Sequence, residues 1–363
     1  MSGYVLYGAE VSYFTGKVRA YLRWRRAPFR EAMATQAVYR DIILANVGWP
    51  VIPVLVMPDG KVVQDSADII AEVEAAEGRS PPVIPETPLQ HFVAELLHLY
   101  ADEWQTVPAM HYRWNFNEDW AYGEFGALSA PEASPAEQYA IGRKNGQRFK
   151  GALPVLGVHP ETIPGIEQSY EAFLAEFSAH LEGHPFLLGA RPCLADFAFI
   201  GPLYAHLYRD PASGELMKRL APRVADWVER AIAGQKGEGG LVAGDSIPAT
   251  LEPILARQMR EQLPALAQTL QLFEAWAGQA GADAVLPRGL GEIEVAIEGC
   301  RGPAQARTFP LFRLQAALDV YEVMDIPAKA RADSLLSRIG GAALTTFRPS
   351  KRLVRRKYRL ALA

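Results

Sequence analysis

Ser12 is the first residue whose type and position could support catalysis. It lies in a loop between the apolar residues 4–7, which are typical of a buried strand, and the helical residues 17–26. The first turn of a helix has free N–H groups and carries the positive end of the helix dipole, so it stabilises an anion. A hydroxyl at that point could help to hold a thiolate and so lower the pKa of the thiol. The alternative is that Ser12 only caps the helix.

Asp65 and Ser66 form a second polar pair, at the predicted start of a helix whose apolar stripe contains Ile69, Ile70 and Val73. The hydroxyl and backbone N–H of Ser66, at a helix N-terminus, could bind an anion such as a carboxylate. An Asp-Ser pair is also a good helix cap in its own right, and that role operates in either case.

The elements that position these residues follow the order of a thioredoxin-like unit. The strand at 4–7 and the helix at 17–26 come first. Residues 51–57 and 61–64 then read as two strands joined at the turn signal Asp59-Gly60, which predicts a β-hairpin before the helix at Asp65.

A proline-rich linker follows, and beyond it the hydrophobic periodicity becomes helical. The sequence predicts helices over 91–102, 136–149, 165–181, 194–207, 219–232, 311–324 and 328–339, a helical stretch over 247–276 divided by Pro248, Pro253 and Pro264, a glycine-rich loop over 234–244, a strand over 292–298, and a basic tail from residue 348.

Three patterns in this order carry a resemblance to a known family. They are SYFTGKVR at 12–19, VIPVL at 51–55 together with the Asp65-Ser66 pair, and FLLGARPCLADF at 186–197. Together they closely resemble the glutathione transferase superfamily, especially its bacterial theta-like and omega-like members, over roughly residues 1–232.

The resemblance implies an α/β thioredoxin-like N-terminal domain plus an all-α glutathione transferase C-terminal domain, with a mostly helical C-terminal extension. The predicted parts are a glutathione-binding domain at 1–80, a linker at 81–88, a helical domain at 89–232 and the extension at 233–363. In the third pattern, Cys193 replaces the usual Ser or Thr of a helix capping box while Asp196 remains, so we interpret Cys193 as buried and inert.

The activity that the resemblance implies is transfer of glutathione, as co-substrate, to a hydrophobic electrophile. Ser12 would stabilise the glutathione thiolate. Tyr7 is a second candidate, because some classes use a tyrosine from the first strand; the alternative is that Tyr7 is a packed strand residue.

Glutathione binding is expected at residues 52–66. Pro53 resembles the family's cis-proline, which turns the backbone of Ile52 toward the cysteinyl part of the tripeptide like an added strand; an ordinary trans proline is the alternative. Ser66 and Asp65 would hold the γ-glutamyl group. Residues 46–51, where the family places a cation for the glycyl carboxylate, contain none, so Arg40 is the candidate for that role.

Tyr112 and Trp114 are the first candidates for the hydrophobic substrate pocket. They belong to an aromatic-rich stretch that falls where the family builds this pocket, and an aromatic lining suits an apolar electrophile. The alternative is that these rings pack in the core or at a domain interface.

Composition excludes several other classes of function. The 363 residues carry a formal net charge of −4, which gives no electrostatic footprint for nucleic acid. No run of about 18 apolar residues predicts a membrane span, and the N-terminus does not read as a signal peptide. Two cysteines are too few for a disulfide framework and fit the reduced cytoplasm. No zinc motif is present, because helix-breaking residues interrupt the pair His180 and His184, so no metal is expected.

Two hypotheses of function therefore remain. The leading one is a glutathione transferase-like enzyme, expected by the resemblance to form a homodimer. The alternative is a non-catalytic binding or scaffold protein that has kept the fold, which the missing cation and the long extension favour.

Overall fold

The computed structural model describes residues 3–281 and 284–363. The chain divides into two compact units that are each discontinuous in sequence. The first contains residues up to 83 with 109–152 and 196–237, and the second contains 84–108, 153–195 and 238–363. The boundaries predicted at 80, 88 and 232 stay a prediction.

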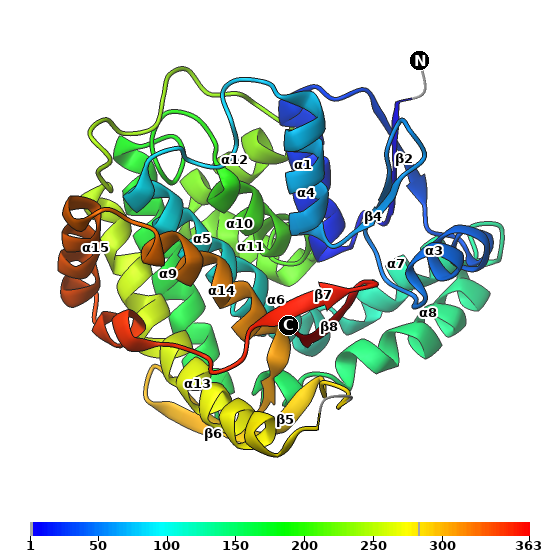
Figure 1. Cartoon of the computed structure of the whole chain (residues 1–363). Coiled ribbons are helices and arrows are strands. Elements are labelled where there is room, and N and C mark those ends of the chain that lie inside the picture. The colour runs from blue at the N-terminus through cyan, green and yellow to red at the C-terminus, as the bar shows by residue number, and fades with distance from the viewer. Residues whose placement is uncertain (1–2, 282–283) are drawn as a thin grey trace. The chain divides into compact units, whose positions relative to one another are not determined.

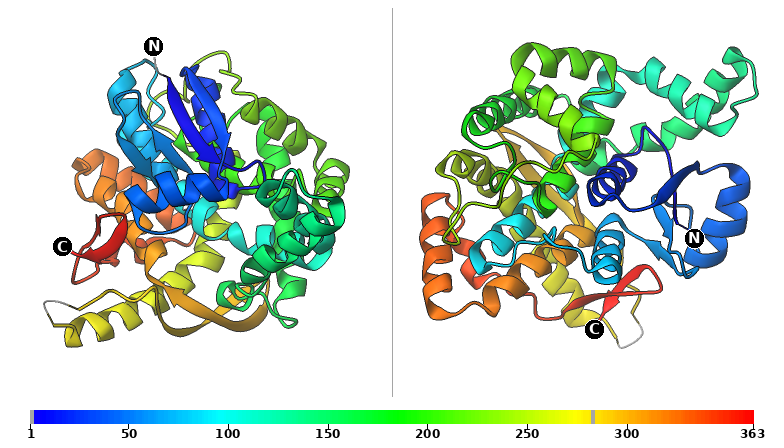
Figure 2. Two further views of the ribbon diagram at one scale, coloured as in Figure 1. Left: turned by 90° about the vertical axis from the view of Figure 1, so that its right-hand side faces the viewer. Right: turned by 90° about the horizontal axis from the view of Figure 1, so that it is seen from above.

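The first unit contains the expected thioredoxin-like domain (Figures 1 and 2). Its four-stranded sheet has the order β2-β1-β3-β4, with β1 parallel to β2 and antiparallel to β3. Helices α1 and α4 lie side by side against the sheet. The elements of this domain are β1 (Tyr4–Gly8), α1 (Tyr13–Arg25), β2 (Phe29–Met33), α2 (Gln36–Val38), the π-helix η1 (Tyr39–Leu44), α3 (Ala45–Val47), β3 (Val54–Val56), β4 (Val62–Gln64) and α4 (Ser66–Glu77).

Helices complete the first unit, and α7 and α8 form its most extensive helix pair. They are the C-terminal part of α6 (Thr106–Phe116), α7 (Glu118–Ser129), α8 (Pro135–Lys150), most of α10 (Leu194–Ala205), α11 (Pro211–Leu220) and α12 (Pro222–Ile232). The single helix predicted over 219–232 is wrong. The helix is interrupted at Ala221, and Pro222 starts the next helix because a proline at the first helical position needs no hydrogen-bonded N–H.

The second unit combines two helices of the predicted helical domain with the extension. α14 packs along α5, and the β5–β6 hairpin packs against α13 (Figure 1). Its elements are α5 (Pro88–Glu103), η2 (Pro154–Leu156), α9 (Ile163–Gly183), η3 (Ala249–Leu251), α13 (Glu252–Gln279), β5 (Gly289–Ile297), β6 (Cys300–Arg307), α14 (Thr308–Glu322), α15 (Ile326–Arg338), η4 (Ala342–Thr346), β7 (Leu353–Arg356) and β8 (Arg359–Leu362).

Proline affects α13 less than the sequence predicts. Pro253 lies in the first turn, where its missing N–H costs nothing. Pro264 lies inside the helix, yet the helix continues, because Leu263, Ala265 and Leu266 beside it are all buried. Tertiary packing here outweighs the interior proline's cost of about 3 kcal/mol.

Asp245 ties the extension to the start of α5. Its carboxylate accepts hydrogen bonds from the backbone N–H groups of Leu89 at 3.0 Å and Gln90 at 3.1 Å, and Arg331 donates to it at 2.8 Å. Burial alone would raise the pKa of Asp245, but the hydrogen bonds from Arg331, Thr87 and these N–H groups lower it. A distant residue therefore caps α5 in place of a local one.

We expect Asp245→Ala to lower the free energy of unfolding by about 1–2 kcal/mol, the usual range for a lost cap. Because the pKa of Asp245 is lowered in the folded state, the carboxylate contributes to the free energy of unfolding at neutral pH, and this contribution disappears as the pH falls through the folded-state pKa. Urea unfolding at neutral and acid pH checks this, with Asp245→Asn as the control that keeps an acceptor. A difference from wild type that is equally large in acid would contradict the account.

Candidate functional site

Ser12 caps α1, as one of the two interpretations of the sequence requires. Its Oγ accepts the backbone N–H of Thr15 at 3.3 Å, and its backbone is extended while α1 begins at the next residue. The helix thus starts four residues earlier than predicted, and Ser12 lies half-buried at its N-terminus. A catalytic role for Ser12 stays a prediction.

Ile52 and Pro53 come directly before β3, and the peptide bond between them is cis, as predicted. Asp65 caps α4 by accepting the N–H of Ala67 at 2.9 Å. Its φ of 85° is a conformation that a residue other than glycine rarely adopts, at a cost of about 1–3 kcal/mol. Ser66, the first residue of α4, is 4% exposed.

Sheet topology brings these residues to one edge. β1 and β4 are both antiparallel to β3, so they run in the same direction. Their C-terminal ends lead to the N-termini of α1 and α4, while β3 begins at that same edge. Ser12, the Ile52–Pro53 bond and Asp65-Ser66 therefore gather around one end of the sheet, with two helix N-termini that favour an anion.

Tyr7 and Arg40 differ in their surroundings. Tyr7 is 9% exposed in β1 and pairs with Val54 of β3, which agrees with the interpretation as a packed strand residue. Arg40 lies on η1, which follows β2. Its side chain is 74% exposed and makes two hydrogen bonds to Asp41, at 2.6 and 2.7 Å.

Tyr112 and Trp114 are both buried in the first unit. Trp114 is 1% exposed and packs against the rings of Tyr122 and Phe125 on α7. Tyr112 is 5% exposed and its ring stacks on Phe116. Core packing, which the sequence left open as the alternative, accounts for these contacts, and lining of a substrate pocket stays a prediction.

Two buried arginines, which the sequence analysis missed, hold the loop before Ser12. Arg19 on α1 makes two hydrogen bonds of 2.6 Å to Glu31 and donates to the carbonyl of Ala9 at 3.3 Å. Arg113 on α6 donates to the carbonyl of Val11 at 2.9 Å. Residues on both sides of the loop thus fix the backbone that leads to Ser12.

Arg113 is the centre of a buried network. It is 2% exposed and makes a bidentate pair with Asp210, at 2.7 and 2.8 Å, while also donating to the carbonyl of Ala205. Burial, with the nearby guanidinium, holds the pKa of His206 well below its usual range, so its imidazole is neutral. Nε2 of His206 lies 2.9 Å from Arg113 and accepts its N–H, which places the ring proton on Nδ1.

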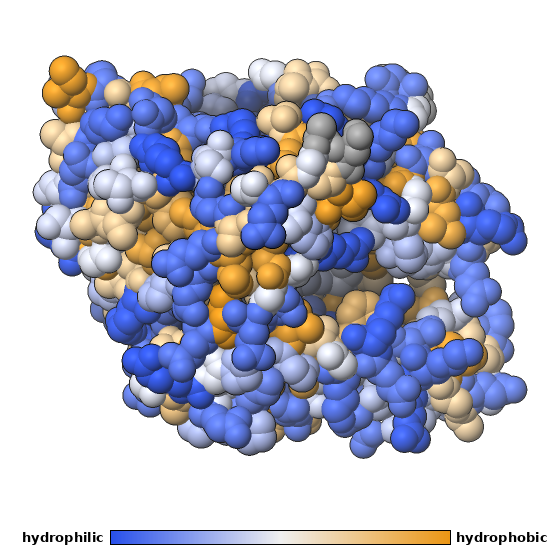
Figure 3. Space-filling view, turned by 60° about the horizontal axis from the view of Figure 1, so that its bottom comes forward, coloured by the Kyte–Doolittle hydropathy of each residue, from blue (hydrophilic) through white to orange (hydrophobic). Residues whose placement is uncertain are grey.

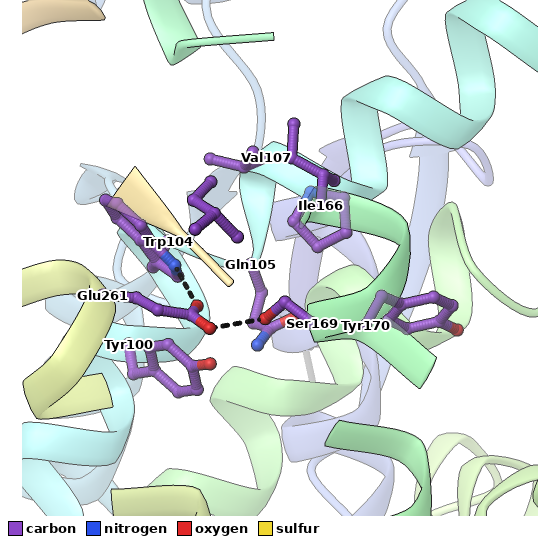
Figure 4. A pocket seen from close by; sticks show the side chains of 10 residues that line it. Tyr100, Trp104, Gln105, Val107, Ile166, Ser169, Tyr170 and Glu261 are labelled. Carbon is purple, nitrogen blue, oxygen red and sulfur yellow. Dashed lines mark hydrogen bonds between the residues drawn. The ribbon is translucent and has the colours of Figure 1, made fainter. Parts of the chain in front are cut away.

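Glu261 on α13, in the second unit, marks another place where chemistry could occur (Figure 4). Its carboxylate accepts hydrogen bonds from Trp104 at 3.0 Å, Ser169 at 2.7 Å and Arg257 at 3.2 Å. Burial raises the pKa of Glu261. The adjoining cavity measures about 10 Å³, which is the space of a single water molecule. These contacts make Glu261 a structural group rather than a substrate site.

Two features of other protein classes are absent from the described part of the chain. Within residues 3–281 and 284–363, no three His, Cys, Asp or Glu side chains are grouped to hold a metal ion. Among the same residues, no helix combines the length and apolarity that crossing a membrane would take.

Comparison with known proteins identifies two domains. Residues 6–81 match the glutathione S-transferase N-terminal domain, and residues 160–230 match the glutathione S-transferase C-terminal domain. No sequence among curated proteins matches the chain.

Three of the solved structures that are similar to this chain come from a plant, a fungus and a bacterium. A Tau class glutathione S-transferase from mango is 18% identical with a TM-score of 0.41, and the match covers 63% of this chain and 88% of that one. A glutathione S-transferase of Ceriporiopsis subvermispora, in complex with glutathione, is 14% identical with a TM-score of 0.44, and the match covers 66% of this chain and 100% of that one. A beta-etherase from Sphingobium sp. strain SYK-6 is 18% identical with a TM-score of 0.46, and the match covers 64% of this chain and 97% of that one.

The assignment rests on the two domain matches, which occur in the order that a glutathione transferase requires and agree with the thioredoxin-like sheet and the helices that follow it. The chain therefore contains the N-terminal and C-terminal domains of a glutathione S-transferase.

Proposed function

We propose that this protein is a glutathione transferase-like enzyme that binds glutathione, activates its thiol at Ser12 and transfers it to a hydrophobic electrophile. The observation that carries the proposal is the convergence of Ser12, the cis Ile52–Pro53 bond and Asp65-Ser66 at one edge of a sheet in a glutathione S-transferase N-terminal domain. Within the superfamily, we propose a theta-like or omega-like member.

The chemistry assigns one task to each element. The thiol gives its proton to solvent, and the N-terminus of α1 and the Ser12 hydroxyl stabilise the thiolate that remains. The sulfur then bonds to a carbon of the electrophile, either displacing a leaving group that departs with its bonding electrons or adding to a double bond whose electron pair then takes up a proton from solvent. Ser66, at the N-terminus of α4, receives the γ-glutamyl carboxylate, and Asp65 balances the neighbouring ammonium. Ile52 pairs with the cysteinyl backbone, and Arg40 would leave Asp41 to bind the glycyl carboxylate.

Titration with glutathione in a calorimeter tests the binding half of this proposal. We expect Ser66→Ala to weaken binding about tenfold or more, because it removes a hydrogen bond to a charged group. Ser134→Ala is the control, since Ser134 is also a serine at a helix N-terminus, as the cap of α8, but has no part in the site. Wild type that fails to bind millimolar glutathione would refute the proposal.

The second candidate is a binding protein of the same fold without catalysis. It is favoured by Arg40, whose guanidinium already pairs with Asp41 in an exposed position. Glutathione that binds with an unchanged thiol pKa would support this candidate over the enzyme.

We also propose that the protein is a cytoplasmic homodimer. The oligomeric state also tests whether a dimer is compatible with the extension, whose helices α14 and α15 pack against α5. Light scattering after size exclusion determines the mass in solution, and a mass of one chain at all concentrations would contradict the dimer.

A further inference from the structure

A second cavity lies in the part of the protein that the extension builds. It is enclosed by the β5–β6 hairpin, α13, the end of α5 and the 3₁₀ turn η2. Its apolar walls include Leu266 of α13, Ile293 and Val295 of β5, and Ala304 of β6, all less than 10% exposed. Val155, 40% exposed, borders the cavity, so solvent can reach it. In Figure 3, which brings forward the side of Figure 1 where α13 and the hairpin lie, apolar residues reach the surface among hydrophilic ones.

Every residue that lines this cavity falls outside the two segments matched to glutathione S-transferase domains. The lining residues lie at 103–107, 155–156 and 262–310, whereas the matches cover 6–81 and 160–230. The cavity is therefore separate from the proposed glutathione site in sequence, and its role does not follow from the family.

The volume of the cavity limits what it can hold. It measures about 40 Å³, and one water molecule needs about 10–15 Å³ on the same measure. The cavity thus has room for about three or four waters, or for one small organic molecule in their place. A peptide or a nucleotide is too large to enter.

The charges around the cavity point to an uncharged occupant. Glu103 and Arg307 are the charged side chains in the lining, and they neutralise each other at 3.1 Å. The polar groups of the α13 wall are already engaged: the Gln262 amide donates to the carbonyl of Leu99 and accepts from Gln258, and the Thr269 hydroxyl donates to the carbonyl of Ala265. Waters held by such walls are easily displaced by an apolar group.

We infer that this cavity is a binding site for a small, uncharged, mostly apolar molecule about the size of a single aromatic ring. Such a molecule replaces poorly held water and buries its own surface against the hairpin and α13. The site is independent of the proposed thiol transfer, so it stands or falls separately from that function.

Fluorobenzene, followed by ¹⁹F NMR, tests the site on the full chain. We expect saturable binding to wild type, at least tenfold weaker binding to Ala304→Leu, which fills the cavity, and unchanged binding to Ala296→Leu. Ala296 lies on the same hairpin, but the alternation along β5 turns its side chain away from the buried face of Ile293 and Val295.

Ala265→Leu fills the cavity from α13 and serves as a second variant should Ala304→Leu fail to fold. 4-Fluorobenzoate, which has the same ring with a negative charge, should bind at least tenfold more weakly than fluorobenzene. Non-saturable partitioning of fluorobenzene, equal binding to wild type and the filled variants, or equal binding of the benzoate would each overturn the inference.

Discussion

Arg113→Met should lower the free energy of unfolding by about 3–5 kcal/mol, the loss that follows when one partner of a buried ion pair is removed. Asp210 is fully buried, and burial raises its pKa while Arg113 acts against that rise. Without the guanidinium, the Asp210 carboxylate and the carbonyls of Val11 and Ala205 all lose a donor. Urea unfolding of wild type and variant measures the change.

The double variant Arg113→Met/Asp210→Asn separates charge from packing. It removes the stranded charge, so it should be more stable than Arg113→Met alone. Arg143→Met is the matched control, because Arg143 is exposed on α8 and its replacement should change stability by less than about 0.5 kcal/mol. A loss for Arg113→Met as small as that of Arg143→Met would contradict the proposed network.

Gly142→Ala should be among the most destabilising single substitutions in the first unit, with a loss of about 3 kcal/mol or more. A Cβ at Gly142 on α8 would lie 1.8 Å from the carbonyl oxygen of Tyr122 and 2.6 Å from the backbone nitrogen of Gly126, both on α7. Because both atoms belong to backbone, no side chain can rotate aside, and the two helices must separate.

Gly123→Ala provides a control of opposite sign on the same helix pair. Gly123 lies inside α7, and a Cβ there would meet nothing within 4 Å. Since alanine is the better helix former, this variant should gain about 0.5–1 kcal/mol. Thermal or urea unfolding of both variants checks the pair of predictions, and similar changes of the same sign would show that close helix contact is not what Gly142 provides.

Local signals in the sequence predicted much of the site's framework. The Ser12 cap, the cis bond before Pro53 and the Asp65 cap each depend on residues within a few positions of one another. The burial of Cys193 is also confirmed. Short-range chemistry of this kind, with the order of strands and helices, was sufficient to predict β1, β3, β4, α1 and α4 of the thioredoxin-like domain, whereas β2 was not located.

Contacts between distant residues could not be predicted in the same way. Arg113 and Asp210 are separated by 97 positions, and nothing near either residue indicates the other. Arg113 also stands in an aromatic-rich stretch, whose pattern favours Tyr112 and Trp114 as functional residues instead. An arginine within an otherwise apolar helix was the one available signal, and it indicates a buried partner without naming it.

The strands of the extension show a second limit of prediction from local sequence. The sequence of β6, CRGPAQAR, does not predict a strand, because it contains glycine, proline and no β-branched residue. The sequence of β7 and β8 indicates only a basic tail, because their turn residues, Lys357 and Tyr358, adopt positive φ without the Asn-Gly signal of such turns. Tertiary packing, rather than local preference, determines these strands.

Thiol activation at Ser12 is the central claim, and the pKa of bound glutathione measures it most directly. Thiolate absorbance of the bound ligand, followed against pH, should give a thiol pKa below that of free glutathione in wild type and in Ser134→Ala. In Ser12→Ala the pKa should return toward that of free glutathione, because the hydroxyl is lost at the N-terminus of α1. A bound thiol whose pKa is lowered equally with and without the Ser12 hydroxyl, or not lowered in wild type, would contradict the account.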